Sequence, residues 1–518
     1  MSQLKALLTD LYQLTMLYGY WLAGRHEEEA SFDLFFRKHP FGGEFTIFAG
    51  LEDVITYLEA FKFDDDDIAY LKSVMPHWRP EFFDWLKKLD CSNLRVDAID
   101  EGKLVFPSVP LLRASGHLGI AQLVETAFLY MVNFPSLITT QAARLRLAAG
   151  FDKECLEFGI RRAQDAMRAS KYAYMGGFDG TSNVLAGQRY GIKVRGTHAH
   201  SWVMSFTSLA QLPNRMMPDA KGEIRDFVES VEYFRAIYAG EGQQTNSGEL
   251  AAFTQYAMAY PDTFLALVDT YDTLKSGAPN FSFVARALNS FGYKALGVRL
   301  DSGDLAYLST RIREVFDQVP CLAGCKIVAS NDLDEGKLLS FKTQKHAIDA
   351  YGIGTALVTC ADQPALGGVY KLSKINGDPR MKFSQVPEKN TIPGVKIPYR
   401  LYGHDGKPII DLMTGEEESS PQIGEKTHCR HPFNPSKRAI VVPTSVEPLH
   451  RCAWNGSRIR PSASLADRRE LVISQLQGMP EDMSRTENPR PYKVAVSEKL
   501  YQEIQTLRDT EVPVEILS

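Results

Sequence analysis

The sequence has no long run of apolar residues, and this lack excludes several classes of protein. Although 44% of its 518 residues are hydrophobic, no stretch approaches the roughly 20 apolar residues of a membrane-spanning helix. Near the N-terminus, Asp10 and Gln13 interrupt the apolar residues, and Lys5 is the lone basic residue before them. We therefore expect no secretory signal, no membrane partner and a cytoplasmic location.

The sequence also lacks an excess of positive charge and has few cysteines. The formal net charge is −5 and there is no long basic run, which argues against a nucleic-acid partner. Cys321 and Cys325 lie four residues apart, but no second pair lies nearby to complete a zinc site. We expect the seven cysteines to be free thiols in a reducing cytoplasm. Local positive groups must then bind any anionic substrate.

The two ends of the chain predict domains that differ from its middle, and the length suits two or three domains. Residues 1–120 combine helical periodicity at 9–24 and 50–90 with strand-like alternation at 31–37, 44–48 and 94–115, which predicts an α+β domain. Residues 373–518 form the C-terminal part, in which we expect a β-meander that begins just before it (369–374, 380–384, 399–411), a surface loop (414–437) and helices (462–476, 496–508). A meander of this size needs a partner, so we expect it to pack on the N-terminal domain.

The middle of the chain, residues 121–372, is expected to be the catalytic domain. A helical segment at 121–149 leads into about seven short apolar strand candidates with crossover segments between them. These are Cys155–Gly159, Tyr172–Met175, Lys193–Gly196, Thr263–Asp269, Ala295–Leu300, Lys326–Ser330 and Ile348–Gly352. The pattern is typical of a parallel sheet, either an α/β barrel or a doubly wound sheet.

Polar residues gather at the carboxyl ends of these strand candidates, where α/β barrels carry their chemistry. They are Arg161, Ser182, Thr197, His200, Asp269, Asp272, Arg299, Asp301, Asp304, Asn331, Asp332, Gly354 and Thr355. Two arginines, several carboxylates, a histidine and a Gly-Thr turn together favour a site for a phosphorylated, metal-chelating substrate.

Two of these strand ends have a composition suited to anions and cations. At 297–305, Arg299 suits a bidentate anion contact, while Asp301 and Asp304 suit a divalent cation or ribose hydroxyls. The structural alternative is a turn with Asp304 as a helix N-cap. At 351–359, Gly354 and Thr355 suit a phosphate at a helix start. The alternative there is a turn that needs glycine only for its shape.

The histidines allow several interpretations. His198 and His200 could be metal ligands, an acid–base pair, or one functional and one incidental residue. Because no third ligand lies nearby in sequence, a nucleophile oriented by Asp269 is favoured over a metal site. His428 and His431 flank Cys429, but they are interpreted as residues of a solvated loop.

Six ordered motifs resemble the nicotinate phosphoribosyltransferase family. They are residues 9–16, 157–163, 176–187, 196–201, 298–305, and 352–355 together with 366–372. The resemblance becomes thinner after residue 372, although a tail of this length is similar to the family's long form. It implies a type II phosphoribosyltransferase fold: an irregular α/β barrel with an additional α+β domain built from both chain ends.

The resemblance also implies an activity and its cofactors. The enzyme would condense nicotinate with 5-phosphoribosyl 1-diphosphate to give nicotinate mononucleotide and diphosphate, the first step of NAD salvage from nicotinate. ATP would be a co-substrate, hydrolysed through a phosphohistidine, and Mg²⁺ or Mn²⁺ would assist. The family works as a homodimer with active sites at the interface.

Roles for single residues follow from the matched motifs. Nicotinate would contact Tyr12 of the neighbouring subunit, Phe158, Arg161, Ser182, Thr197 and Arg299. Phosphoribosyl diphosphate would contact Asp301, Asn331, Gly354 and Thr355. His200 would be phosphorylated and oriented by Asp269, and Asp301 would join them in catalysis. The matched motifs do not identify a metal ligand, for which Asp301 and Asp304 are the candidates.

One position bears on the choice of base. The related nicotinamide-using enzyme carries an aspartate where this chain has Ser182, and an aspartate there would repel a carboxylate. The same fold also allows nicotinamide or quinolinate as the base. Alternatives from other classes are a metal-dependent barrel lyase and a non-catalytic barrel that binds a nucleotide.

Overall fold

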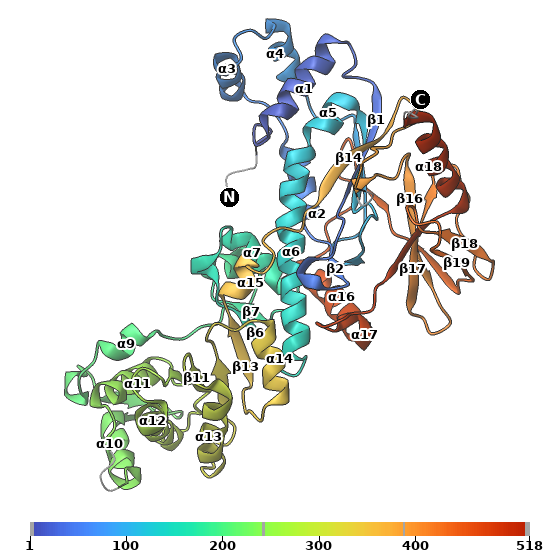
Figure 1. The fold of residues 1–518 in the computed structure, drawn as a ribbon. Helices are drawn as coiled ribbons and strands as arrows, with labels where there is room; N and C mark the ends of the chain where they lie inside the picture. The colour runs from blue at the N-terminus through green and yellow to red at the C-terminus, as the bar shows by residue number, and fades with distance from the viewer. Residues whose placement is uncertain (1–4, 241–243, 387–388, 513–518) are drawn as a thin grey trace. The chain divides into compact units, whose positions relative to one another are not determined.

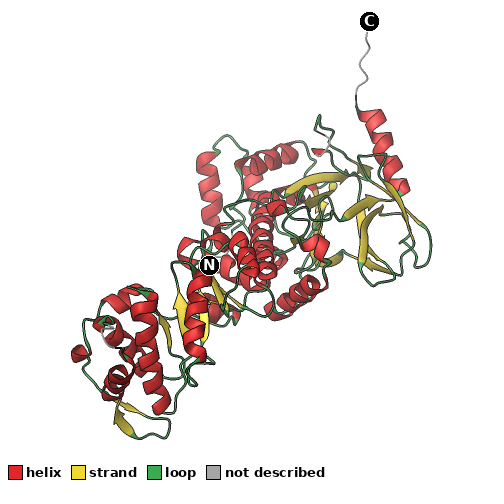
Figure 2. Ribbon diagram, turned by 60° about the horizontal axis from the view of Figure 1, so that its bottom comes forward, coloured by secondary structure: helices red, strands yellow, loops and turns green. Residues whose placement is uncertain are grey.

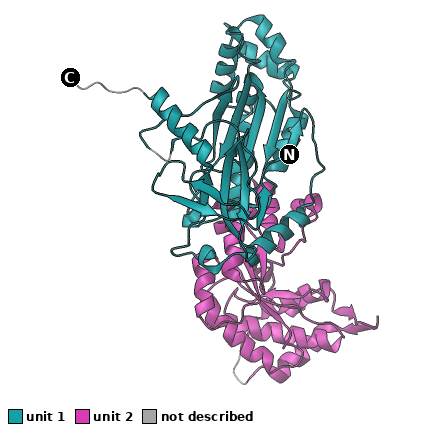
Figure 3. Ribbon diagram, turned by 90° about the vertical axis from the view of Figure 1, so that its right-hand side faces the viewer, with its two compact units in different colours: residues 1–140, 362–518 teal, residues 141–361 magenta. Residues whose placement is uncertain are grey.

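The structure is a computed structural model that describes residues 5–240, 244–386 and 389–512. The chain divides into two compact units, unit 1 (residues 1–140 and 362–518) and unit 2 (residues 141–361), shown in teal and magenta in Figure 3. Both combine helices with strands, so the fold is of the mixed α/β class (Figure 2). No helix in the described ranges is long and apolar enough to cross a membrane.

Unit 1 contains two six-stranded sheets. The first has the order β15-β14-β1-β5-β3-β21 and the second β19-β18-β22-β17-β16-β20. The strands of the first are β1 (Glu29–Phe35), β3 (Leu94–Ala98), β5 (Leu112–His117), β14 (Val369–Ile375), β15 (Asp378–Pro379) and β21 (Arg451–Asn455). Those of the second are β16 (Lys396–Tyr402), β17 (Pro408–Gly415), β18 (Thr427–Arg430), β19 (Arg438–Val441), β20 (Ser445–Pro448) and β22 (Lys493–Val496). The first sheet therefore joins strands from both ends of the chain (Figure 1).

Helices and a small strand pair complete unit 1. The pair is β2 (Thr46–Ile47) with β4 (Leu104–Val105). The helices are α1 (Leu11–Leu22), η1 (Pro40–Gly42), α2 (Leu51–Ala60), α3 (Asp65–Val74), α4 (Pro80–Leu86), α5 (Leu118–Leu123), α6 (Glu125–Ala149, which continues into unit 2), α16 (Leu465–Gly478), α17 (Glu481–Ser484) and α18 (Glu498–Glu511). The expected helix at 121–149 is thus two helices that meet at Val124.

A buried ion cluster connects the two sheets of unit 1. Asp33 on β1 accepts from Arg113 Nε on β5 at 3.2 Å and pairs with Lys396 of β16. All three side chains are about 3% exposed. Burial alone would raise the pKa of Asp33, but the two cations outweigh it and lower that pKa. Removing one partner would leave a buried charge uncompensated, at a cost of about 3–5 kcal/mol.

Unit 2 is built on one parallel six-stranded sheet of order β10-β11-β12-β13-β6-β7. The strands are β6 (Glu154–Glu157), β7 (Gly180–Thr181), β10 (Leu265–Leu267), β11 (Gly297–Leu300), β12 (Lys326–Ala329) and β13 (Ala350–Ile353). The other elements are η2 (Ile160–Arg162), α7 (Ala166–Met175), α8 (Val184–Tyr190), α9 (His200–Met204), η3 (Leu209–Gln211), β8 (Met216–Pro218), β9 (Ile224–Asp226), α10 (Phe227–Tyr238), α11 (Ser247–Ala259), η4 (Thr273–Gly277), α12 (Ala278–Ser290), α13 (Leu305–Asp317), α14 (Glu335–Thr343) and α15 (Thr355–Thr359).

The expected seven-stranded barrel is not confirmed, because the sheet has six strands. Residues 193–196 contribute only a parallel bridge between Val194 and Thr181. A little further on, His198 Nε2 accepts a hydrogen bond from Leu267 N on β10 at 3.3 Å. Residues 194–198 thus contact both β7 and β10, the two edge strands of the sheet.

Three expected elements are wrong. Residues 172–175 lie in α7, where Asp165 caps the helix and buried Ala169, Tyr172 and Ala173 form one helical face rather than a strand. Residues 380–384 form no strand. Residues 414–437 are not all loop, because β18 lies within them and pairs with β19 and β22.

Candidate active site

The carboxyl ends of β10, β11 and β12 bring several of the expected site residues together. Leu267 pairs with Arg299 and Leu300 with Ala329, so the residues that follow each strand are neighbours. This register places Asp269 beside Asp301, whose backbone N–H donates to Asp269 Oδ2 at 3.2 Å. Parallel strands end at a common edge, and a polar site is built there.

His200 is the first residue of α9 and faces both carboxylates. Its Nδ1 lies 3.0 Å from Thr270 Oγ1. Its Nε2 lies 4.0 Å from Asp269 Oδ1 and 3.8 Å from Asp301 Oδ2. The imidazole is 40% exposed, so a substrate can reach it. A hydrogen bond to Thr270 fixes one ring nitrogen and leaves the other turned toward the acids.

Asp269 has an unusual environment for a carboxylate. Its side chain is only 2% exposed. Oδ2 accepts from Ser302 Oγ as well as from Asp301 N, whereas Oδ1 is buried and has no hydrogen-bond partner among the described residues. A buried acceptor without a partner is costly, so this atom invites a ligand, a protonated histidine or a cation.

Asp301 and Asp304 have different surroundings. Asp301 Oδ1 accepts from Ser330 Oγ at 2.6 Å, which leaves Oδ2 toward His200. Asp304 caps α13 by accepting from Tyr307 N at 3.0 Å, as the structural alternative for this residue expected. Asp304 is therefore occupied with its own helix, and of the two carboxylates Asp301 has the oxygen that could hold a metal.

The oxygen donors of this edge fit a divalent cation that also contacts the substrate. Mg²⁺ prefers carboxylate oxygens and typically takes only one or two of them, with phosphate oxygens completing its shell. Asp269 Oδ1 and Asp301 Oδ2 are such atoms. The described residues contain no group of three or more His, Cys, Asp or Glu side chains that could hold a metal by themselves.

Arg299 supplies positive charge beside the carboxylates. It donates from Nη1 to Thr197 Oγ1 at 3.4 Å and from Nη2 to the His198 carbonyl at 3.1 Å. Its Nε is buried without a partner. Burial lowers the pKa of Arg299, and Arg161 lowers it further while Asp301 and Asp269 oppose the shift. Arg161, on η2, is exposed and lies close enough to Arg299 to affect the pKa of that residue.

His198 has a structural environment. It is 9% exposed, and its ring packs edge-on against Tyr256 with centroids 4.8 Å apart. Its Nε2 accepts the backbone N–H of Leu267, and its Nδ1 lies 3.4 Å from the Ala199 carbonyl. Burial lowers the pKa of His198 to about 4. The residue is thus neutral and aligns β10 with the segment that carries His200.

The ends of β6 and β13 form a second cluster around Phe158. The Phe158 ring lies directly over Gly352, where an added Cβ would come within 2.4 Å of Phe158 Cδ2. Phe158 N also donates to the Ile353 carbonyl at 2.8 Å. Gly354 follows as the N-cap of the short helix α15, which begins with Thr355. Gly352 is therefore required for the position of the aromatic ring.

Ser182 follows β7 and is held by a buried acid that the sequence did not single out. Ser182 N donates to the Glu157 carbonyl at 2.9 Å. The Glu157 carboxylate is 1% exposed and accepts from Ser170 Oγ and Thr181 Oγ1. This network fixes the ends of β6 and β7, so Ser182 and Phe158 are presented from rigid strands.

Two expected site residues stand apart in their contacts. Tyr12 belongs to α1 of unit 1, where it is 48% exposed. Asn331 is half-buried and makes no side-chain hydrogen bond to another described residue. The residues that sequence reasoning missed are Thr270, Ser302 and Ser330, which bond His200, Asp269 and Asp301. The sequence could have indicated these three residues only by their position directly after or close to the end of a predicted strand.

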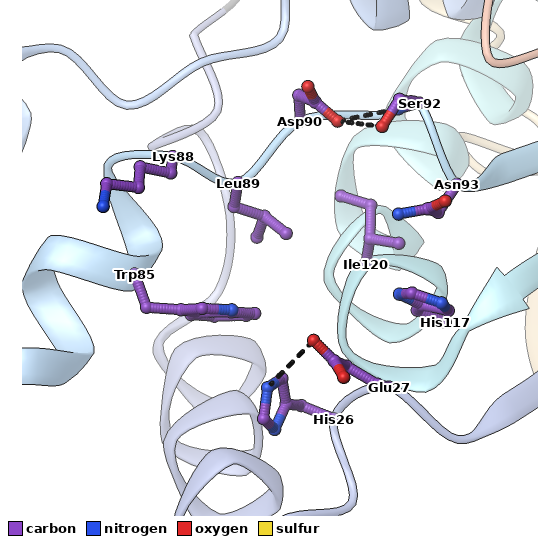
Figure 4. A pocket seen from close by; sticks show the side chains of 10 residues that line it. All are labelled: His26, Glu27, Trp85, Lys88, Leu89, Asp90, Ser92, Asn93, His117 and Ile120. Atoms are coloured by element: carbon purple, nitrogen blue, oxygen red, sulfur yellow. Dashed lines mark hydrogen bonds and ion pairs between the residues drawn. The ribbon is translucent and has the colours of Figure 1, made fainter.

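Unit 1 has pockets of its own that contain none of the expected site residues. One of about 260 Å³ lies between α4 and α5 (Figure 4). Trp85 and Leu89 lie on one side of it, and Ile120 and His117 lie on the opposite side (Figure 4). Acidic and basic groups are mixed along its wall, so its charge favours no particular ligand.

Comparison with known proteins covers nearly the whole chain. Three family models match: the nicotinate phosphoribosyltransferase N-terminal domain at residues 7–133, the nicotinate phosphoribosyltransferase family at 153–420, and the nicotinate phosphoribosyltransferase C-terminal domain at 395–504. Nicotinate phosphoribosyltransferase 2 of Arabidopsis thaliana is 51% identical over 98% of this chain and 95% of its own length. The Caenorhabditis elegans nicotinate phosphoribosyltransferase is 48% identical over 98% and 94%. The crystal structure of human nicotinic acid phosphoribosyltransferase superposes with a TM-score of 0.86 at 43% identity, covering 96% of this chain and 99% of that one.

Proposed function

The chain belongs to the nicotinate phosphoribosyltransferase family, and from this premise we propose how its residues carry out the reaction. The enzyme condenses nicotinate with 5-phosphoribosyl 1-diphosphate to give nicotinate mononucleotide and diphosphate, a step of NAD biosynthesis. Similarity along the whole chain is the observation that carries this activity. The site geometry supports the assignment of roles to single residues.

The nicotinate site would lie between Phe158 and the two arginines. The pyridine ring stacks on Phe158, whose position Gly352 permits. The carboxylate is bound by Arg299, which has an unpartnered Nε, with Thr197 and Arg161 beside it. Ser182 presents a neutral hydroxyl that does not repel this carboxylate. These contacts orient the ring nitrogen for attack.

The phosphoribosyl group would occupy the strand ends next to it. The 5-phosphate binds at Gly354 and Thr355, the start of α15. Asp301 and Asn331 contact the ribose hydroxyls. The pyridine nitrogen forms a bond to ribose C1 as the bond from C1 to the diphosphate oxygen breaks. Positive charge develops on the ribose, and the carboxylates of Asp301 and Asp269 stabilise it.

A divalent cation, Mg²⁺ or Mn²⁺, fits the free oxygens of Asp269 and Asp301. When bound, it neutralises charge on the diphosphate leaving group and on the phosphates of ATP. The protein's contribution is to hold the two carboxylates in place through Ser302 and Ser330. Two carboxylates beside an incoming phosphoryl group would otherwise repel it, which favours a cation there.

ATP coupling would proceed through His200. In the tautomer that this step requires, Nδ1–H donates to Thr270 Oγ1, which keeps the Nε2 lone pair free and exposed. Nε2 attacks the γ-phosphorus of ATP, so an N–P bond forms as the P–O bond to ADP breaks. Water later cleaves the phosphohistidine, releasing phosphate and restoring the imidazole. This route links ATP hydrolysis to an otherwise reversible condensation.

Two further features belong to the proposal. Unit 2 would be an irregular barrel that residues 194–198 close by contacting β7 and β10. The enzyme would be a homodimer in which Tyr12 of one subunit reaches the nicotinate of the other. Exposed Leu8, Leu11 and Tyr12 on and beside α1 suit a surface that a second copy covers. A cytoplasmic location agrees with free thiols at Cys321 and Cys325.

The test of the activity is a product assay with purified protein. Nicotinate, phosphoribosyl diphosphate, ATP and Mg²⁺ should give nicotinate mononucleotide and diphosphate in equal amounts. A barrel lyase would form neither product, and a binding-only barrel would leave both substrates intact. Labelled γ-phosphate should appear on the protein as an acid-labile adduct, whose absence would remove the phosphohistidine and leave the transferase assignment untouched.

A further inference from the structure

A larger cavity in unit 1 has no role in the reaction described above. It measures about 640 Å³, a size typical of sites for small organic ligands. Its wall is formed by the segment after β1, by residues 107–108, and by parts of β17, β18, β19 and β22. Much of it comes from residues 414–437 and their neighbours, a segment for which the sequence offered no function.

The charge in this cavity is opposite in sign to that of the whole protein. Arg37, Lys437, Arg438 and Lys493 line it, whereas Glu44 is the one carboxylate among the described lining residues. The chain as a whole carries a formal net charge of −5. Four cations gathered around one cavity of an acidic protein point to an anionic ligand.

These cations have no acidic partner within the described residues. In the described ranges, no ion pair involves Arg37, Lys437, Arg438 or Lys493, and Arg37 Nε is buried without a hydrogen-bond partner. Burial lowers the pKa of Arg37 and raises that of Glu44. A buried guanidinium nitrogen without an acceptor is destabilising, and a bound anion would supply the acceptor.

The remaining wall is apolar and partly aromatic. Phe433 and Tyr492 line the cavity together with Ile410 and Val494. The Tyr492 ring is held in place, because it stacks on Phe106 with centroids 3.7 Å apart and donates its hydroxyl to Asp411. Such a wall suits a planar heterocycle.

We propose that this cavity is a second ligand site, which binds a nucleoside di- or triphosphate. The base lies against Phe433 and Tyr492, and the phosphates lie among the four cations. Guanidinium and ammonium groups together match phosphate oxygens in both geometry and charge. The site uses none of the residues assigned to catalysis, so its occupancy is separable from turnover.

Calorimetric titration with ADP tests this site. The pocket variant carries Lys437→Ala, Arg438→Ala and Lys493→Ala, all at exposed positions. The control variant carries Lys62→Ala, Lys407→Ala and Lys426→Ala, which remove the same charge from exposed positions outside the cavity. The full-length protein should bind two ADP per chain, one in the cavity and one at the catalytic site.

In the pocket variant, one of the two binding phases should weaken at least about tenfold, because hydrogen bonds to charged groups are lost. The control variant should keep both phases. Identical isotherms in the two variants would overturn the proposal. The transferase assay is run in parallel at saturating substrates. A protein without transferase activity would contradict the proposed function. The comparison of isotherms would still show whether ADP binds in the cavity.

Discussion

At the scale of single residues, two histidines that lie two positions apart on one segment have opposite environments. His198 is buried and neutral and accepts a backbone hydrogen bond, whereas His200 is half-exposed between two carboxylates. The sequence pattern could place both at a strand end but could not decide between them. Their burial and hydrogen-bond partners distinguish the two histidines. These partners, Leu267 and Thr270, lie about 70 positions further along the chain, so the local sequence does not reveal them.

Replacement of His200 by alanine tests the phosphohistidine. ATP hydrolysis coupled to transfer should fall at least about 100-fold, because the attacking nitrogen is gone. Slow transfer without ATP should persist, since Arg299 and Phe158 are untouched. ADP and mononucleotide are measured in the same reaction. Thr270→Val is the matched variant, expected to lower ATP hydrolysis about tenfold through the loss of the Nδ1 hydrogen bond. Unchanged ATP coupling in the alanine variant would contradict the role of His200.

Ser182 tests the choice of base. Ser182→Asp places a carboxylate beside that of nicotinate, and kcat/KM for nicotinate should fall about 10- to 100-fold. Ser182→Asn is the neutral control and should lose much less. Both are compared by steady-state kinetics with nicotinate and nicotinamide. Equal losses in the two variants would mean that volume, not charge, matters at this position.

At the scale of elements, the lack of a side chain at Gly352 lets the Phe158 ring, which follows β6, pack directly on strand β13. Gly352→Ala should displace the Phe158 ring, raise KM for nicotinate and destabilise the protein by about 1–3 kcal/mol. Gly324→Ala, in the same unit, is the control, since its added Cβ would meet nothing within 4 Å. Denaturant unfolding and KM are measured for both. An unchanged KM in Gly352→Ala would mean that Phe158 does not contact nicotinate.

The same scale shows what the sequence could predict. Five of the apolar segments proposed as strands overlap β6, β10, β11, β12 and β13, because a buried parallel strand needs a short apolar run. Residues 172–175 form a similar short run, yet they belong to a helix that begins at the N-cap Asp165. β7 is only two residues long, and β18 lies in a polar segment, so neither has an apolar pattern that composition could reveal.

At the scale of the whole molecule, sequence adjacency reveals little about which distant residues meet. The first sheet of unit 1 pairs β1 with β14 and β3 with β21, elements separated by more than 300 residues. Thr270, Ser302 and Ser330 likewise gain their meaning only from the register of neighbouring strands. Composition and periodicity predicted only a barrel enzyme with a phosphate and metal site. The family motifs were needed to predict the activity.

The proposed homodimer can be tested by mixing two inactive variants. Tyr12→Ala should lack the ring contact from one subunit, and Arg299→Ala should lack the carboxylate contact from the other. After unfolding and joint refolding, mixed dimers contain one intact site, so about a quarter of the normal activity should return. Each variant refolded alone is the control. No recovery in dimers shown to be mixed would place Tyr12 and Arg299 of one chain in the same site.

The central claim is transfer of a phosphoribosyl group to nicotinate. It is tested most directly by incubating the purified protein with phosphoribosyl diphosphate, ATP and Mg²⁺, and with nicotinate, nicotinamide or quinolinate side by side, while diphosphate release is measured. We predict release with nicotinate and at least about 100-fold less with the other two bases. Equal or faster release with nicotinamide or quinolinate, or none with nicotinate at any ATP concentration, would contradict the account.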